Sequence, residues 1–117
     1  MFGFFSNKQH GSNIAYDEAV IIEIDFAGLD QFGTDEQKQA VKSLEEELEG
    51  SLKAPEGLDG DEFGEGQALI YLYGPSADKI FEKVQPVLKR SPFSHITITL
   101  QYGLPDDPNT KEKTFSL

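Results

Sequence analysis

The sequence contains no cysteine, and every kind of site that needs a thiol is therefore excluded. Disulfide frameworks, thiolate nucleophiles and cysteine-ligated zinc or iron–sulfur centres all depend on that side chain. No apolar run approaches the roughly 18 residues of a transmembrane helix. The apolar stretch at residues 1–5 has neither a preceding basic region nor a following small-residue cleavage site, so it does not resemble a signal peptide. We therefore expect a cytoplasmic protein.

Basic residues are also scarce. The 117 residues include 10 Lys and Arg against 21 Asp and Glu, which gives a net charge of −11. Nucleic acids and anionic membranes bind mainly through Lys and Arg, so this balance disfavours both partners. The charge is uneven, because residues 17–65 hold 16 acids and 3 lysines, a net of −13. A basic protein partner or a cation suits this half, although an acidic surface can also serve solubility alone.

Alternating apolar residues predict the strands. In residues 19–26, Ile22, Ile24 and Phe26 alternate with acidic residues, which indicates a strand with one buried face. Residues 67–73 and 95–102 show the same period, and weaker patterns predict a short strand near 56–63 and an edge strand within 111–117. In residues 67–73 the side chains of Leu69, Tyr71 and Tyr73 share one face, opposite Ala68, Ile70 and Leu72.

Two helices are expected between these strands. The first covers about residues 35–49, since Thr34 and Gln37 have the spacing of a capping box and Gly50 suits a helix end. The second covers about residues 76–89, where Pro86 should kink or limit the helix. Their apolar stripes consist of Val41, Leu44 and Leu48 in the first helix, and Ile80, Phe81, Val84, Val87 and Leu88 in the second.

The order of these elements is β-α-β-β-α-β, followed by a fifth strand. It predicts one α+β domain over residues 1–117, with a ferredoxin-like (split βαβ) antiparallel sheet of four or five strands and both helices on one face. Residues 1–13 are expected to be a loose N-terminal segment, because residues 6–13 are polar and rich in Gly, Ser and Asn. The sheet face with Leu69, Tyr71 and Tyr73 is a candidate interface for a homodimer or a ligand, and a monomer remains open.

Residues 59–66 place four carboxylates among glycines. Calcium and magnesium need oxygen ligands of this kind, but the EF-hand pattern fails because Phe63 and Ile70 fall at ligand positions. We predict no metal site and expect a polar hairpin whose glycines, Gly64 among them, take positive φ. The alternative interpretation is that this loop and the acidic end of the first helix bind a partner. The candidate partner-binding residues are Glu45, Glu46, Glu49, Asp59, Asp61, Glu62 and Glu65.

No catalytic constellation is predicted, and no cofactor motif is present. The two histidines, His10 and His95, lie in a polar loop and at the start of a strand, and no serine has the G-x-S-x-G context of a nucleophile. There is no P-loop and no dinucleotide fingerprint. An enzyme that uses Asp61, Glu62 or His95 is the weakest of three functional hypotheses.

Residues 59–88 contain a DG-x-E-x-G-x-G segment and a Y-G-P-x-A-D-x-x-F-x-x-V-x-P-x-L strand–helix segment. This pattern resembles a group of small bacterial proteins, and the resemblance implies a bacterial cytosolic protein without assigning a catalytic role. The matching residues are Asp59, Gly60, Glu62, Gly64, Gly66, Tyr73, Gly74, Pro75, Ala77, Asp78, Phe81, Val84, Pro86 and Leu88.

The leading functional hypothesis is a non-enzymatic acidic protein that binds a basic protein partner. An immunity or inhibitor protein is one form of it, by analogy of size, charge and architecture. The alternative is a small regulatory or ligand-binding module that dimerises through its sheet face.

Overall fold

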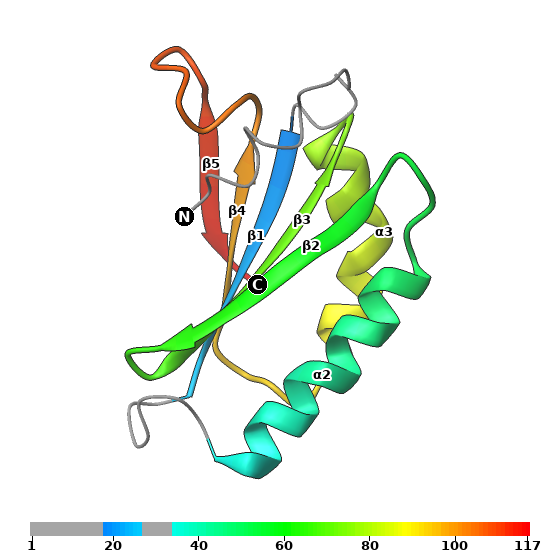
Figure 1. Cartoon of the computed structure of the whole chain (residues 1–117), viewed down its shortest axis with the longest axis vertical. Helices are drawn as coiled ribbons and strands as arrows, with labels where there is room; N and C mark the ends of the chain where they lie inside the picture. Colours follow the sequence, from blue (N-terminus) through cyan, green and yellow to red (C-terminus); the bar gives the residue numbers. More distant parts are fainter. Residues whose placement is uncertain (1–17, 27–33) are drawn as a thin grey trace.

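A computed structural model describes residues 18–26 and 34–117 of the chain. It contains a five-stranded antiparallel sheet and two helices packed against it (Figure 1). The strands are β1 (Glu18–Asp25), β2 (Gly57–Gly64), β3 (Gln67–Gly74), β4 (Ile96–Gln101) and β5 (Glu112–Ser116), and the helices are α2 (Asp35–Gly50) and α3 (Ala77–Lys89). The predicted α+β class and all seven elements are thus confirmed.

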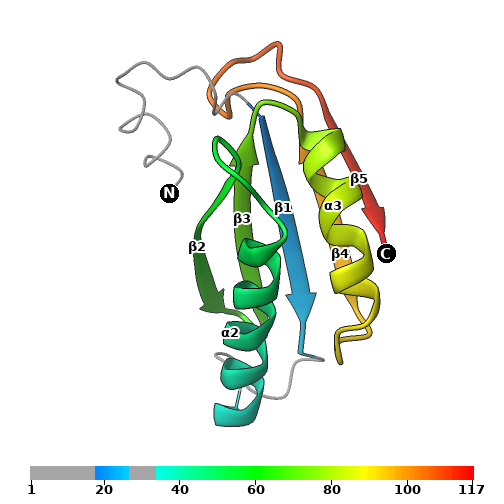
Figure 2. The same cartoon turned by 90° about the vertical axis from the view of Figure 1, so that its right-hand side faces the viewer.

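The strand order across the sheet is β2-β3-β1-β4-β5, so β2 and β5 are the two edges. The central strand β1 pairs with β3 on one side, Ile22 opposite Ile70, and with β4 on the other, Ile22 opposite Ile98. Because side chains alternate along a strand, this register gathers isoleucines on one face. Figure 2 shows α2 and α3 side by side over that face.

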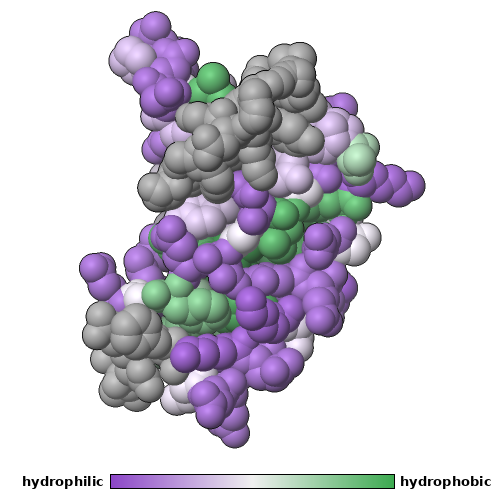
Figure 3. Space-filling view, in the orientation of Figure 1, coloured by the Kyte–Doolittle hydropathy of each residue, from purple (hydrophilic) through white to green (hydrophobic). Residues whose placement is uncertain are grey.

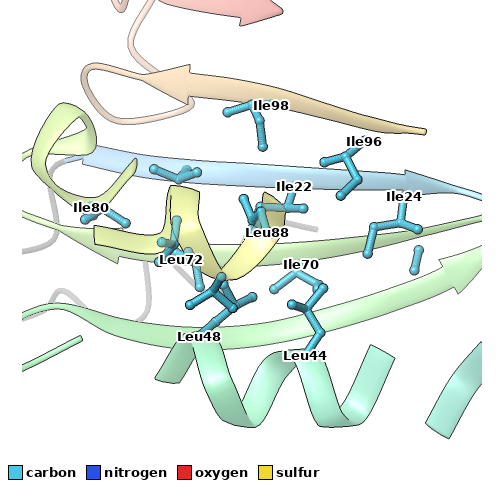
Figure 4. Packing of buried hydrophobic residues seen from close by; sticks show 14 of the residues in the cluster. Ile22, Ile24, Leu44, Leu48, Ile70, Leu72, Ile80, Leu88, Ile96 and Ile98 are labelled. Carbon is cyan, nitrogen blue, oxygen red and sulfur yellow. The ribbon is translucent and has the colours of Figure 1, made fainter. Parts of the chain in front are cut away.

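The hydrophobic core lies between the helices and this face of the sheet (Figure 4). Leu44 and Leu48 of α2 meet Ile70 and Leu72 of β3, while α3 contributes Ile80 and Leu88. The predicted apolar stripes are therefore the buried sides of the two helices, with the exception of Phe81, which is only partly buried. It contacts Phe115 edge-on, with ring centroids 5.2 Å apart, and this contact ties β5 to α3.

Local signals fix the helix ends. Thr34 caps α2, since its Oγ1 accepts from Gln37 N–H and Gln37 Oε1 accepts from Thr34 N–H at 2.8 Å. Gly50 is the last helical residue rather than a left-handed cap, because Ser51 follows it with ordinary helical φ and ψ. The helix α3 begins after its N-cap Ser76 and continues through Pro86 to Lys89.

The hairpin between β2 and β3 differs from the prediction in one respect. Gly64 pairs with Gln67 in extended backbone, and the positive φ angles fall at the next two residues, 55° at Glu65 and 77° at Gly66. Positive φ at both central positions is the geometry of a type I′ two-residue turn, which explains the shift. The expectation of positive φ at Gly64 was wrong, because this glycine belongs to the ladder and not to the turn.

The described residues do not include the predicted loose segment 1–13, with its polar loop at 6–13 and His10. They also leave out residues 27–33, which connect β1 to α2. In the part of the chain that is described, no helix has the length and apolar character needed to cross a membrane.

Candidate functional site

The predicted acidic residues lie around one edge of the sheet. The edge strand β2 carries Asp59, Asp61 and Glu62, and α2 packs beside it. Asp61 lies opposite Ile70 and therefore faces the helices, whereas Glu62 lies opposite Leu69 and faces the other side. The acidic segment is thus divided between the two faces of the edge strand.

On the helix side, Asp61 meets Lys42 and Glu45 of α2. Lys42 Nζ lies 3.1 Å from Asp61 Oδ2 and 3.9 Å from Glu45 Oε1. The Glu45 side chain is 12% exposed, and its Oε2 atom is buried without a hydrogen-bond donor among the described residues. We call these three residues the helix-side cluster. It holds two carboxyl groups and one ammonium group.

Burial and the adjacent Asp61 carboxylate raise the pKa of Glu45 to about 8. Glu49, one turn further along α2, adds to this effect, while Lys42 opposes it. Burial opposes ionisation of Asp61, but hydrogen bonds from Glu45 and Lys42 outweigh it and lower the pKa of Asp61. At neutral pH Glu45 therefore retains a proton, and its carboxyl O–H can donate to the Asp61 carboxylate.

On the other face, a shallow hollow of about 250 Å³ opens at the hairpin. We call it the hairpin pocket; it is lined by Glu62, Phe63, Gly64, Glu65, Gln67 and Leu69. Tyr71 Oη donates to Glu62 Oε1 at 3.0 Å and so orients this carboxylate. Burial and this bond raise the pKa of Tyr71 to about 12, and the hydroxyl therefore stays a donor. The pocket combines two carboxylates with an apolar wall.

The remaining candidates are spread more widely. Glu46 and Glu49 are exposed on α2, and Asp59 is half-buried at a bulge of β2 between Leu58 and Gly60. Figure 3 shows hydrophilic residues over the lower part of the molecule, where α2 lies, and a smaller hydrophobic area near the end of β2. The seven acidic candidates do not form one patch.

The three sheet-face candidates share the face without helices, as predicted. Leu69 and Tyr73 are partly buried, but Tyr71 is only 8% exposed and contacts Glu62. The Tyr73 ring lies over Gly57, where a Cβ atom would come within 2.5 Å of its hydroxyl.

The residues of the enzyme hypothesis are not assembled into one site. Asp61 and Glu62 face opposite sides of β2, and His95 is exposed just before β4, where its carbonyl accepts from Asp25 N–H at 3.0 Å. The N-terminus of α3 already holds a carboxylate of the chain, because Ala77 N–H donates to Glu18 Oε1 at 2.8 Å. Within the described ranges, no group of three potential ligands is arranged to hold a metal.

Neither Lys42 nor the role of Tyr71 in orienting Glu62 was predicted from the sequence. The spacing of Lys42 and Glu45 indicates contact along a helix, but only the tertiary structure places Asp61, 19 positions later in the chain, beside Lys42. A second hollow of about 310 Å³ lies between α3 and β4, lined by Leu88, Lys89, Phe93, Ser94, Ile96 and Leu117, and it contains none of the predicted residues.

Comparisons of the chain with protein-family models, with curated proteins and with solved structures find no match. The function must therefore be inferred from the residues and their geometry.

Proposed function

We propose that this protein is a non-enzymatic binding protein that recognises a basic protein partner through its hairpin pocket. The observation that carries the proposal is the combination, in one hollow, of Glu62 and Glu65 with the apolar Leu69. Arginine and lysine side chains have an apolar stem and a cationic end, so they match an apolar wall beside carboxylates.

The size of the hairpin pocket supports a side chain rather than a free ligand. Its volume of about 250 Å³ is below the roughly 300–1,000 Å³ of typical small-molecule sites. The surrounding charge favours the same partner, because the net −13 of residues 17–65 attracts basic proteins and speeds their association. An inhibitor or immunity protein that covers a basic surface is one form of this function.

The homodimer through the sheet face stays the second candidate. Leu69 and Tyr73 favour it, since both are partly accessible on the face without helices. Among the described residues, however, the most exposed large hydrophobic side chains are Leu104 and Leu117, and neither belongs to this face. Light scattering at micromolar concentration distinguishes this candidate, because a dimer has twice the mass of the chain.

The proposal also includes a fold assignment and a location. The order β2-β3-β1-β4, with a helix before β2 and another before β4, supports a ferredoxin-like (split βαβ) fold with β5 added at one edge. The resemblance of residues 59–88 to small bacterial proteins supports a bacterial cytoplasmic location.

The test uses two blocked tripeptides, Ac-Ala-Arg-Ala-NH2 and its neutral counterpart Ac-Ala-Gln-Ala-NH2, titrated into isotope-labelled protein and followed by NMR. We expect the arginine peptide alone to shift the backbone signals around Glu65 and Leu69. Raising the salt concentration from about 50 to about 500 mM should weaken these shifts, because screening reduces the attraction between exposed charges.

A matched pair of variants separates a specific site from general charge. The double variant E62Q/E65Q should lose the response, while E46Q/E49Q, which removes the same charge from the exposed surface of α2, should keep it. Equal losses in both variants, or no response in the unmodified protein, would overturn the proposal.

A further inference from the structure

The outer edge of β2, over residues 60–64, has backbone hydrogen-bonding groups that pair with no other described segment. This strand is the first of the sheet and pairs with β3 alone, so alternate N–H and C=O groups point away from the sheet. Among the described residues, no backbone hydrogen bond joins this part of β2 to a segment other than β3. In Figure 1, β2 is the strand nearest to the viewer, and no labelled element crosses its outer side.

The second half of β2 is regular and open. After the bulge at Leu58/Gly60, the register with β3 is unbroken from Gly60 to Gly64. A Cβ atom added at Gly60 or Gly64 would meet no described atom within 4 Å, so the face without helices is open at both positions. A second chain can therefore approach this stretch closely.

Charge decides what kind of chain would fit. In this stretch Asp61 faces the helix-side cluster and Glu62 faces the hairpin pocket, and the strand contains no basic residue. A strand lying beside β2 would likewise alternate its side chains between the two faces. A segment with basic residues at successive positions would find the Glu62 carboxylate on one face and the Asp61 carboxylate, which is paired with Lys42, on the other, whereas an acidic segment would be repelled by Glu62.

We propose that an extended, basic segment of the partner adds to the sheet as a sixth strand alongside β2. Its basic side chains then alternate between the hairpin pocket and the helix-side cluster. This inference rests on the proposed function, to which it adds the conformation and the charge pattern of the recognised segment. Such strand addition takes its affinity from the main chain and its specificity from the alternate side chains.

The helix-side cluster can accept another cation. Lys42 is 58% exposed, so its ammonium group can move aside while the partner's cation approaches Asp61 and Glu45. A second cation beside Glu45 favours its ionised form, and binding at neutral pH should therefore release a proton. The other sheet edge, β5, differs because Lys113 within it and Lys111 just before it repel a basic segment.

The test uses the blocked heptapeptide Ac-TRKTKRT-NH2 and two analogues with N-methylated backbones, one at the odd and one at the even positions. In an added strand, one set of N–H groups pairs with β2 and the other points to solvent. We expect one analogue to bind at least about tenfold more weakly than the parent, since it loses several hydrogen bonds, and the other to bind as well as the parent. Hydrogen exchange should slow in residues 60–64 and stay unchanged in β5.

The outcomes separate the two proposals. If all three peptides bind equally, the contact is electrostatic only, and strand addition is overturned while the proposed function stands. If none binds at low salt, the proposed function fails as well. Calorimetry at pH 7 in buffers with different ionisation enthalpies gives an independent readout. The unmodified protein should release a proton when the peptide binds, and E45Q should not. Equal proton release by both proteins would overturn the placement of a basic side chain at the helix-side cluster.

Discussion

Glu45 links the stability of this protein to pH. Burial and the Asp61 carboxylate raise its pKa in the folded protein to about 8, above the ordinary value of 4.5. Between these two values the folded state holds a proton that the unfolded state has released. The contribution of Glu45 to the free energy of unfolding is therefore fully present below about pH 4.5 and is lost progressively as the pH rises through about 8.

The substitution Glu45→Gln tests this dependence, because the amide resembles the protonated acid at every pH. We expect E45Q to gain stability relative to the unmodified protein as the pH rises from 5.5 to 8.5, measured by urea unfolding. The exposed neighbour Glu46 supplies the control, since E46Q should leave the difference flat. A constant difference between E45Q and the unmodified protein over this range would contradict the assigned pKa.

The hairpin turn contains a second sensitive residue, Gly66, with a φ of 77°. Gly66→Ala should lower the free energy of unfolding by about 1–2 kcal/mol, because a Cβ atom is strained in the left-handed region. Gly64→Ala is the matched comparison in extended backbone with open space, and it should cause no loss. Thermal unfolding of both variants measures the difference, and a larger loss in the Gly64 variant would reverse the assignment of the turn.

At the scale of single elements, local capping and long-range packing stabilise α2 separately. The capping box consists of two hydrogen bonds between Thr34 and Gln37, each from a backbone N–H to a side-chain oxygen, at an exposed helix end. The other end is unfavourable, because acidic residues accumulate near the negative end of the helix dipole and the last turn has no basic residue. We therefore expect the N-terminal cap to matter more than usual for this helix.

Thr34→Ala should reduce the free energy of unfolding by about 1 kcal/mol, since one first-turn N–H loses its partner. Ser43→Ala, at an exposed position in the middle of the same helix, serves as the control and should not reduce stability. Chemical unfolding followed by circular dichroism provides the measurement. Equal effects of the two substitutions would show that the capping box does not stabilise the helix.

At the scale of the whole molecule, one buried core connects both helices to the three inner strands of the sheet, β1, β3 and β4. Ile98 of β4 and Leu48 of α2 belong to the same buried cluster, although α2 lies at the β2 edge of the sheet. The two edge strands join this core through partly buried residues, β2 through Leu58 and Phe63 and β5 through Phe115, which packs on α3. The sheet and the two helices should therefore unfold together.

Ile98→Val tests this cooperativity with a small cavity. We expect a loss of about 0.5–1.5 kcal/mol, with the helical circular dichroism and the tyrosine fluorescence shifting to the same new midpoint. Two separate transitions would show that α2 and the β4–β5 side of the sheet unfold independently.

Much of the architecture could be predicted from local patterns. The alternation of Ile96, Ile98 and Leu100 matches β4, and the spacing of Val41, Leu44 and Leu48 matches the buried side of α2. The Thr34–Gln37 capping box is also a local feature and was found as predicted. Such signals depend on residues within a few positions of one another, and the backbone geometry converts them directly into burial.

The candidate site depended on contacts that no local pattern contains. The sequence determined that Asp61 and Glu62 are acidic neighbours in a strand, and strand geometry then requires that they face opposite sides. Only the tertiary structure decided that Asp61 meets Lys42 and Glu45, and that Tyr71 orients Glu62 beside the hairpin pocket. The pairing of distant segments sets these contacts, because α2 packs over one face of β2 and brings Lys42 and Glu45 to Asp61.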